Sequence, residues 1–209
     1  MFPLKNILHY LCRVNTSSLL WYNSDADFDK LYPERIQRLS DRHWTPIDVA
    51  RKAAAFLANA PGKRVLDIGS GVGKFCLIGA HFFPLVSFYG IEQREELYRH
   101  AVDAQVATHI KNAMFLHGNL TQTDLSSYDN FYFYNSFFEN LDERDPIDNQ
   151  FDYSISRYLY YSRYLFNALE RRPAGTRLVF YHSLGDEVPS AYQLVDASDD
   201  MLLRMYIKR

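Results

Sequence analysis

The sequence predicts an α/β fold, a doubly wound and mostly parallel sheet of seven strands in which the last strand is reversed. Three observations indicate this fold. Short apolar runs alternate with segments of helical periodicity, which is typical of parallel sheets. A strand over residues 65–68 is followed by glycines at alternate positions, Gly69, Gly71 and Gly73. Only residues 197–200, Ala-Ser-Asp-Asp, separate the final two strands, which indicates a hairpin.

The chain divides into an N-terminal extension or lid, residues 1–43, and a main domain, residues 44–209. A length of 209 residues and a hydrophobic content of 47% suit one domain with a sizeable core. Residues 1–14 carry apolar side chains at helical spacing, but polar residues interrupt them. We therefore expect a short docking helix there rather than a signal peptide or a membrane anchor.

A helix is expected to begin at Thr45, with this threonine as the N-cap and Pro46 in the first turn. Asp48 follows three residues after the cap and strengthens this prediction. The helix should run to about Asn59, because the breaker pair at 61–62 follows it.

The remaining elements follow from the apolar periodicity of the chain. We expect helices over residues 74–83, 94–109 and 152–171, a polar loop over 142–150, and strands over 86–91, 113–117, 130–137, 176–181, 191–196 and 201–208.

The glycine turn is the feature that most restricts function. Glycine reaches positive φ without strain, and its missing Cβ lets a ligand press on the backbone. The helix that follows offers N–H groups and a positive dipole end, so we expect a nucleotide-like ligand. The dinucleotide pattern G-x-G-x-x-G does not fit, because Lys74 stands where the third glycine should be. A P-loop does not fit either, because Phe75 follows Lys74 in place of serine or threonine.

The pattern D-x-G-x-G-x-G over residues 67–73 resembles motif I of the class I S-adenosylmethionine (SAM)-dependent methyltransferases. This resemblance implies a Rossmann-like fold, SAM as cofactor and S-adenosylhomocysteine as product. It also implies a set of residues around the amino-acid end of SAM: Asp67, Gly69, Ser70, Gly71 and Gly73.

Two further positions extend the expected cofactor site. Glu92 ends the second strand, where an acid can accept both ribose hydroxyls, and Gln93 follows it. The third strand leads to Asn119 and Leu120, where the family commonly has Gly-Asp. An amide oxygen can accept the same hydrogen bond from the adenine amine as a carboxylate. Nicotinamide oxidoreductases share the Glu92 geometry, and only the glycine spacing disfavours them.

The end of the fourth strand resembles motif IV of methyltransferases that act on amines. Base-modifying members have Asn followed by Pro-Pro-aromatic, and the disruptor-of-telomeric-silencing histone lysine family has Asn-Asn-Phe. This chain has Asn135 and Phe138, with Ser136 and Phe137 between them. The resemblance implies that Asn135 accepts an N–H of the target amine and that Phe138 packs on the target. Alternatively, Asn135 caps the strand and touches only the methionine part of SAM.

The remaining residues and the net charge restrict the classes of ligand and partner that we expect. The seven histidines and two cysteines show no metal-ligand or redox spacing, so we expect no metal and a reducing cytoplasm. His182, after the fifth strand, is a candidate general base. Glu139 is expected either to bind a cationic substrate or to be solvated. A net charge of −2 argues against a broad nucleic-acid surface. No apolar run reaches the roughly 20 residues of a membrane span.

We therefore expect a SAM-dependent methyltransferase that modifies an amine nitrogen of a small molecule or a protein lysine. The extension 1–43 and the loop 142–150 would cover the substrate. The alternative is a SAM- or nucleoside-binding protein without transferase activity, acting as a sensor or partner subunit.

Overall fold

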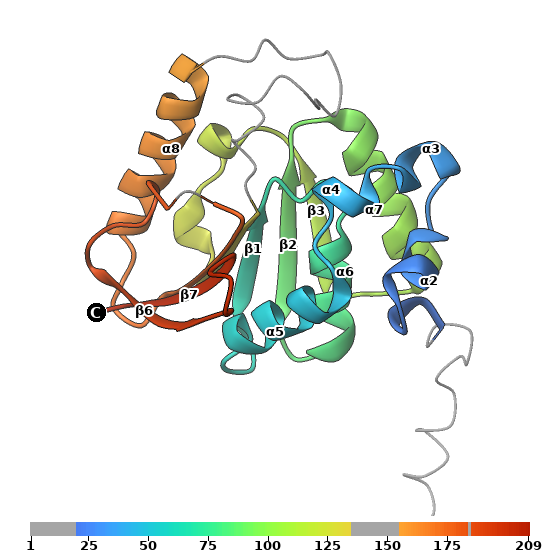
Figure 1. The fold of residues 1–209 in the computed structure, drawn as a ribbon, viewed down its shortest axis with the longest axis horizontal. Helices are drawn as coiled ribbons and strands as arrows, with labels where there is room; N and C mark the ends of the chain where they lie inside the picture. Colours follow the sequence, from blue (N-terminus) through green and yellow to red (C-terminus); the bar gives the residue numbers. More distant parts are fainter. Residues whose placement is uncertain (1–19, 135–154, 184) are drawn as a thin grey trace, which may run out of the picture.

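The computed structural model describes residues 20–134, 155–183 and 185–209, and these form one seven-stranded sheet flanked by helices (Figure 1). The strands are β1 Arg64–Ile68, β2 Ser87–Glu92, β3 Ala113–His117, β4 Asn130–Tyr134, β5 Arg177–Tyr181, β6 Tyr192–Ala197 and β7 Leu203–Lys208. Their order is β3-β2-β1-β4-β5-β7-β6. The first five strands pair in parallel, and β7 is antiparallel to both β5 and β6. The predicted fold class is confirmed.

The helices also follow the predicted alternation. The larger ones are α5 Ile47–Leu57, α6 Lys74–Phe82, α7 Glu95–Thr108 and α8 Ile155–Glu170. Short helices precede them (η2 Leu20–Tyr22, α2 Asp25–Asp29, α3 Glu34–Gln37, α4 Ser40–His43) or follow β3 (η3 Leu120–Gln122, η4 Leu125–Ser127). Within the described residues, no helix is both long enough and apolar enough to span a membrane.

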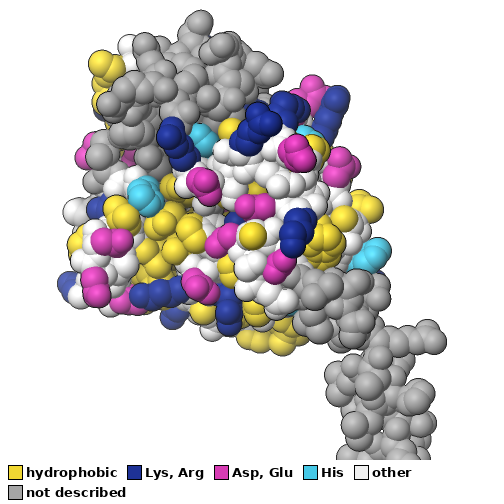
Figure 2. Space-filling model, turned by 45° about the vertical axis from the view of Figure 1, so that its right-hand side comes forward, with side chains coloured by type: hydrophobic (Ala, Val, Ile, Leu, Met, Phe, Trp, Pro, Cys, Tyr) yellow, Lys and Arg dark blue, Asp and Glu magenta, His cyan; other side chains and the backbone are white. Residues whose placement is uncertain are grey.

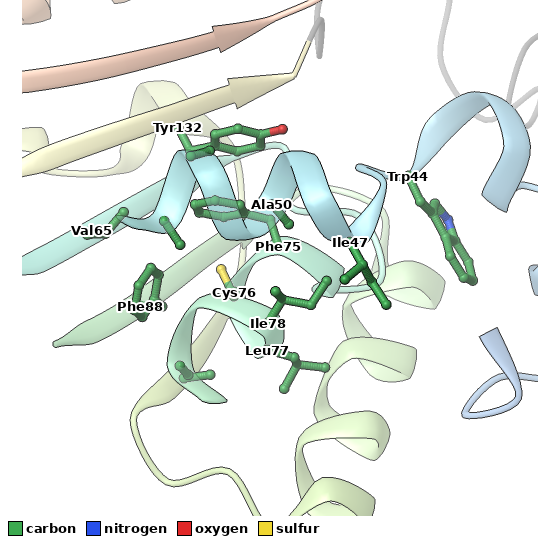
Figure 3. Packing of buried hydrophobic residues seen from close by; sticks show 14 of the residues in the cluster. Trp44, Ile47, Ala50, Val65, Phe75, Cys76, Leu77, Ile78, Phe88 and Tyr132 are labelled. Carbon is green, nitrogen blue, oxygen red and sulfur yellow. The ribbon is translucent and has the colours of Figure 1, made fainter. Parts of the chain in front are cut away.

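Successive side chains of the central strands enter two separate cores, because side chains alternate between the faces of a strand. Tyr132 of β4 joins the core that includes α5 and α6, whereas Phe131 and Phe133 join the core that includes α8. Figure 3 shows the first core, where the ring of Tyr132 stacks on Phe75 of α6 at 3.8 Å between centroids. The sheet is therefore buried on both faces, as expected of a parallel sheet.

The N-terminal segment, residues 20–46, packs into the first core. Tyr22, Phe28, Tyr32 and Ile36 are all buried there, in the same cluster as residues of α6. The predicted docking helix over residues 1–14 lies outside the described residues. The boundary at 43–44 stays a prediction, but the described part of the extension shares its core with the main domain.

The start of α5 differs from the prediction. Pro46 occupies the N-cap position and makes no side-chain cap, so Thr45 is not the N-cap. The Thr45 hydroxyl instead lies 2.8 Å from the Tyr132 hydroxyl. The N–H of Ile47 donates to Asp25 Oδ1 at 3.0 Å, so an aspartate from the N-terminal segment replaces the predicted cap.

Candidate functional site

The strand order reverses between β1 and β4, and in open α/β sheets ligands bind at the carboxyl ends of the strands at such a point. The glycine turn after β1 lies at this point. Gly69, Gly71 and Gly73 have φ values of 75°, 53° and 84°, a conformation that favours glycine at all three positions. The local conformation that the sequence predicted is therefore present.

The three glycines differ in what surrounds them. A Cβ on Gly73 would lie 2.4 Å from the Phe115 ring of β3 and 3.0 Å from Ala101 of α7. A Cβ on Gly71 would meet nothing within 4 Å. Gly73 therefore permits close packing of the helix, whereas Gly71 leaves open space above the turn.

The amides of the turn bond to the end of β2. The N–H groups of Gly69 and Ser70 donate to the Ile91 carbonyl at 3.0 and 2.9 Å. Gly90 provides the room, because a Cβ there would lie 2.6 Å from the Ser70 Cβ. The turn therefore has a fixed position on its neighbouring strand.

Glu92 completes this arrangement. One carboxylate oxygen accepts from the Gly71 N–H at 2.9 Å and the other from the Arg94 N–H at 2.8 Å. The side chain is 5% exposed, and burial raises the pKa of its carboxyl. The structure thus brings Glu92 to the glycine turn, while its contact with a ribose stays a prediction.

Asp67 lies beneath the turn, 3% exposed. Its carboxylate accepts from the Cys76 thiol, with 3.7 Å between Sγ and Oδ2. Burial raises the pKa of Asp67 well above its ordinary value. Burial also raises the pKa of the Cys76 thiol, so neither group favours its charged form here.

Asn119 follows β3, and its side chain is fully engaged. Its amide oxygen accepts from the N–H and the hydroxyl of Thr121, at 3.0 and 2.9 Å, and so caps η3. Its amide nitrogen donates to the Tyr161 hydroxyl at 2.8 Å and to Gln93 Oε1 at 3.3 Å. The Leu120 side chain is buried in the second core. The contact of Asn119 with adenine stays a prediction. Because the Leu120 side chain is buried, a contact of Leu120 with adenine would be made by its backbone.

A cavity of about 310 Å³, including the part open to solvent, lies beside the turn. Its walls come from the β1 end and turn (Asp67, Gly69, Ser70, Gly71, Val72), from α6 (Lys74, Phe75), from the N-terminal segment (His43, Trp44, Thr45) and from β4 (Tyr132, Tyr134). No sequence motif pointed to the last two groups as walls of a cavity. Among these residues only Thr45, followed by Pro46, belongs to a recognisable local pattern, and that pattern is typical of a helix cap.

The end of β4 adds an aromatic group to the cavity wall. The Tyr134 hydroxyl donates to the Arg42 carbonyl at 2.9 Å, and burial raises its pKa to about 12. The Tyr134 ring lies 4.8 Å from the Tyr181 ring and 5.7 Å from the His182 ring. The structure therefore places the candidate base His182 beside a wall of the cavity.

Other predicted site residues lie outside the described part of the chain. These are Asn135 and Phe138, with Ser136, Phe137, Glu139 and the loop 142–150. Tyr134, the residue immediately before Asn135, lines the cavity. Across residues 20–134, 155–183 and 185–209, no group of three or more His, Cys, Asp or Glu side chains is arranged to hold a metal ion.

The charged side chains near the site are of both signs. Figure 2 shows Lys and Arg side chains interspersed with Asp and Glu over the face that carries the N-terminal segment. Inside the site, the ammonium of Lys74 lies 2.6 Å from Asp25 Oδ1 and 3.2 Å from Asp29 Oδ1. This lysine is 3% exposed.

No protein-family model matches the chain, and no curated protein does. Solved structures do match. An RNA methyltransferase from Salinibacter ruber, in complex with S-adenosyl-L-homocysteine, has a TM-score of 0.54 at 20% identity, over 79% of this chain and 92% of that chain. TrmN from Thermus thermophilus has a TM-score of 0.54 at 21% identity, over 84% of this chain, which spans 52% of that chain.

A SAM-dependent methyltransferase from Aquifex aeolicus has a TM-score of 0.51 at 16% identity, over 76% of this chain and 88% of that chain. At such low identities the likeness establishes the fold. The chain has the seven-stranded, Rossmann-like fold of class I methyltransferases.

Proposed function

We propose that this protein is a SAM-dependent methyltransferase that binds SAM on the glycine turn. The observation that carries the proposal is the pairing of Gly71 with Glu92. The space above Gly71 is open, and a buried carboxylate on the next strand holds its amide. The Salinibacter ruber structure, which shares the fold, was solved with S-adenosyl-L-homocysteine, and this supports SAM as the ligand.

The residues around the glycine turn fit such a ligand. The turn from Asp67 to Gly73 would hold the amino-acid end, and Glu92 and Gln93 the ribose. The Leu120 backbone and Asn119 would hold the adenine, with Asn119 Oδ1 exchanging its bond from the Thr121 hydroxyl for one from the adenine amine. The bound cofactor supplies a methyl group activated on a sulfonium. The protein then has to align the acceptor with that methyl group, since the reacting atoms must lie about 3–3.5 Å apart.

The acceptor that we propose is an amine nitrogen, on a small molecule or on a protein lysine. The aromatic ring of Tyr134 lines the cavity, the Tyr181 ring lies 4.8 Å from it, and Tyr134 immediately precedes the predicted Asn135 in the chain. Aromatic faces stabilise a cation by about 0.5–2 kcal/mol, which favours a forming ammonium. His182, in contact with both tyrosines, is the candidate to take the proton that the amine loses.

Calorimetric titration of the folded protein with SAM, S-adenosylhomocysteine and NAD tests the proposal. We expect micromolar binding of the first two ligands and none of NAD. Glu92→Ala should abolish binding, and Glu95→Ala, which removes an exposed glutamate of α7, should leave it unchanged.

Failure of the folded wild type to bind either SAM or its product would overturn the proposal. Turnover with an amine acceptor then separates a methyltransferase from a SAM-binding protein without transferase activity.

A further inference from the structure

Lys74 occupies a position that disfavours its charge. It is the first residue of α6, where the helix dipole is positive and stabilises acids rather than cations. Its side chain is 3% exposed, and a buried ammonium is costly unless it is paired. The contacts of Lys74 must therefore compensate for both effects.

The compensation comes from the N-terminal segment. Asp25 and Asp29 of α2 both contact the Lys74 ammonium, at 2.6 and 3.2 Å. The ammonium also lies over the rings of Phe28 and Trp44, at 5.4 and 5.5 Å from their centroids. One lysine of the glycine-turn region thus binds two acids and two aromatic rings of one segment.

Asp25 extends this network to the start of α5. The oxygen that contacts Lys74 also accepts the N–H of Ile47. Between α2 and Ile47 in the chain lie His43, Trp44 and Thr45, which line the cavity. A second tie lies nearby, because the buried Tyr32 hydroxyl donates to the Val72 carbonyl at 3.0 Å.

We propose that Lys74 is a positioning residue for the cofactor cavity: through Asp25 and Asp29 it holds the N-terminal segment in place as one wall of the cavity. The inference rests on the proposed function, because it assigns the cavity to SAM. It predicts that the ion network sets the affinity for the cofactor as well as the stability of the fold.

An exposed ion pair between α2 and its C-cap residue provides the matched control. Lys30 and Asp27 lie 2.7 Å apart, with side chains 64% and 36% exposed. Exposed pairs of this kind contribute little to stability. Lys30→Met therefore removes a lysine contact from α2 without touching the cavity.

The test compares Lys74→Met, Asp25→Asn, the triple variant K74M/D25N/D29N and Lys30→Met, each titrated with S-adenosylhomocysteine below its unfolding temperature. We expect at least tenfold weaker binding for K74M and three- to tenfold weaker binding for D25N, whose amide oxygen can still accept from Ile47. The triple variant should bind S-adenosylhomocysteine more tightly than K74M but more weakly than the wild type, because it does not leave two carboxylates unpaired beside the cavity. K30M should bind within twofold of the wild type.

A second control separates positioning from stability alone. His100→Gly in α7 lowers the unfolding temperature away from the cavity, and its affinity for S-adenosylhomocysteine should not change. Wild-type affinity in K74M and D25N would overturn the inference while leaving the proposed function in place. Absence of binding by the wild type would overturn the proposed function, and this inference with it.

Discussion

Among single residues, those of the same chemical type meet different requirements around the glycine turn. Gly71 and Gly73 both adopt positive φ, yet open space surrounds one and the Phe115 ring presses against the other. Asp67 and Glu92 are both buried acids, yet backbone amides bond Glu92, whereas Asp67 accepts from a thiol. Substitutions should separate these requirements.

Gly71→Ala and Gly73→Ala are expected to fail in different ways. Either alanine costs about 1–2 kcal/mol for its left-handed backbone. G73A adds the clash with Phe115, so its free energy of unfolding should fall by about 2–5 kcal/mol in total. G71A projects a methyl group into the open space and should weaken S-adenosylhomocysteine binding more than tenfold. Urea unfolding and calorimetry would measure both effects, and equal affinity in wild type and G71A would contradict the assignment of this space.

Asp67→Asn should change how stability depends on pH. The pKa of Asp67 is raised in the folded protein, so the native state holds the proton at pH values where the unfolded chain, with a pKa of 3.8, has lost it. The contribution of this group to stability is therefore present at low pH and is lost as pH rises through the folded pKa.

Asparagine does not titrate, so D67N does not lose this contribution. The unfolding temperature of D67N, relative to that of the wild type, should therefore rise as pH rises from 5 to 8.5. Thermal unfolding at several pH values measures the difference. The exposed Asp48→Asn provides the control and should track the wild type. Parallel curves for D67N and the wild type would show that Asp67 titrates normally.

Among the helices, strands and turns, the sequence predicted those features that depend on neighbouring residues in the chain. Apolar periodicity and glycine spacing predicted the strands, the glycine turn and the position of Glu92 at the end of β2, because each depends on neighbours in sequence. The predicted N-cap of α5 was wrong, because Asp25, 22 positions earlier in the chain, accepts the hydrogen bond from the Ile47 N–H. Lys74 and Tyr132 became site residues only through packing of the N-terminal segment and β4, which no short motif encodes.

The C-terminus of α7 offers a test at this scale. His109 ends the helix with φ of 57°, a left-handed position that usually holds glycine, and its side chain is exposed. His109→Gly should therefore raise the free energy of unfolding by about 0.5–1 kcal/mol. Urea denaturation would measure it against His100→Gly, within the same helix, which should lower the stability by about the same amount. A loss of stability in H109G would contradict the prediction.

At the scale of the whole molecule, the segment that the sequence set apart as an extension is part of the core. Tyr22, Phe28, Tyr32 and Ile36 are each buried against the main domain. The main domain therefore relies on side chains that lie N-terminal to its predicted boundary.

A chain that begins at residue 44 should not fold stably. Each of the four lost side chains contributes about 1.5–3 kcal/mol of burial, and their sum is comparable to a whole domain's stability of about 5–15 kcal/mol. Circular dichroism and thermal unfolding would compare it with a chain that begins at residue 20, which retains these contacts. A cooperative transition at the same temperature in both chains would show that residues 20–43 are dispensable.

The hydrogen bonds of the glycine turn have a consequence for how a ligand arrives. Three glycines in five residues would suggest a flexible loop. Its N–H groups nevertheless donate hydrogen bonds to the Ile91 carbonyl and the Glu92 carboxylate. Folding has already met the entropic cost of ordering these residues. A ligand that binds the turn contacts a preorganised surface. Its association can therefore be a single step, with no slow conformational change after the encounter.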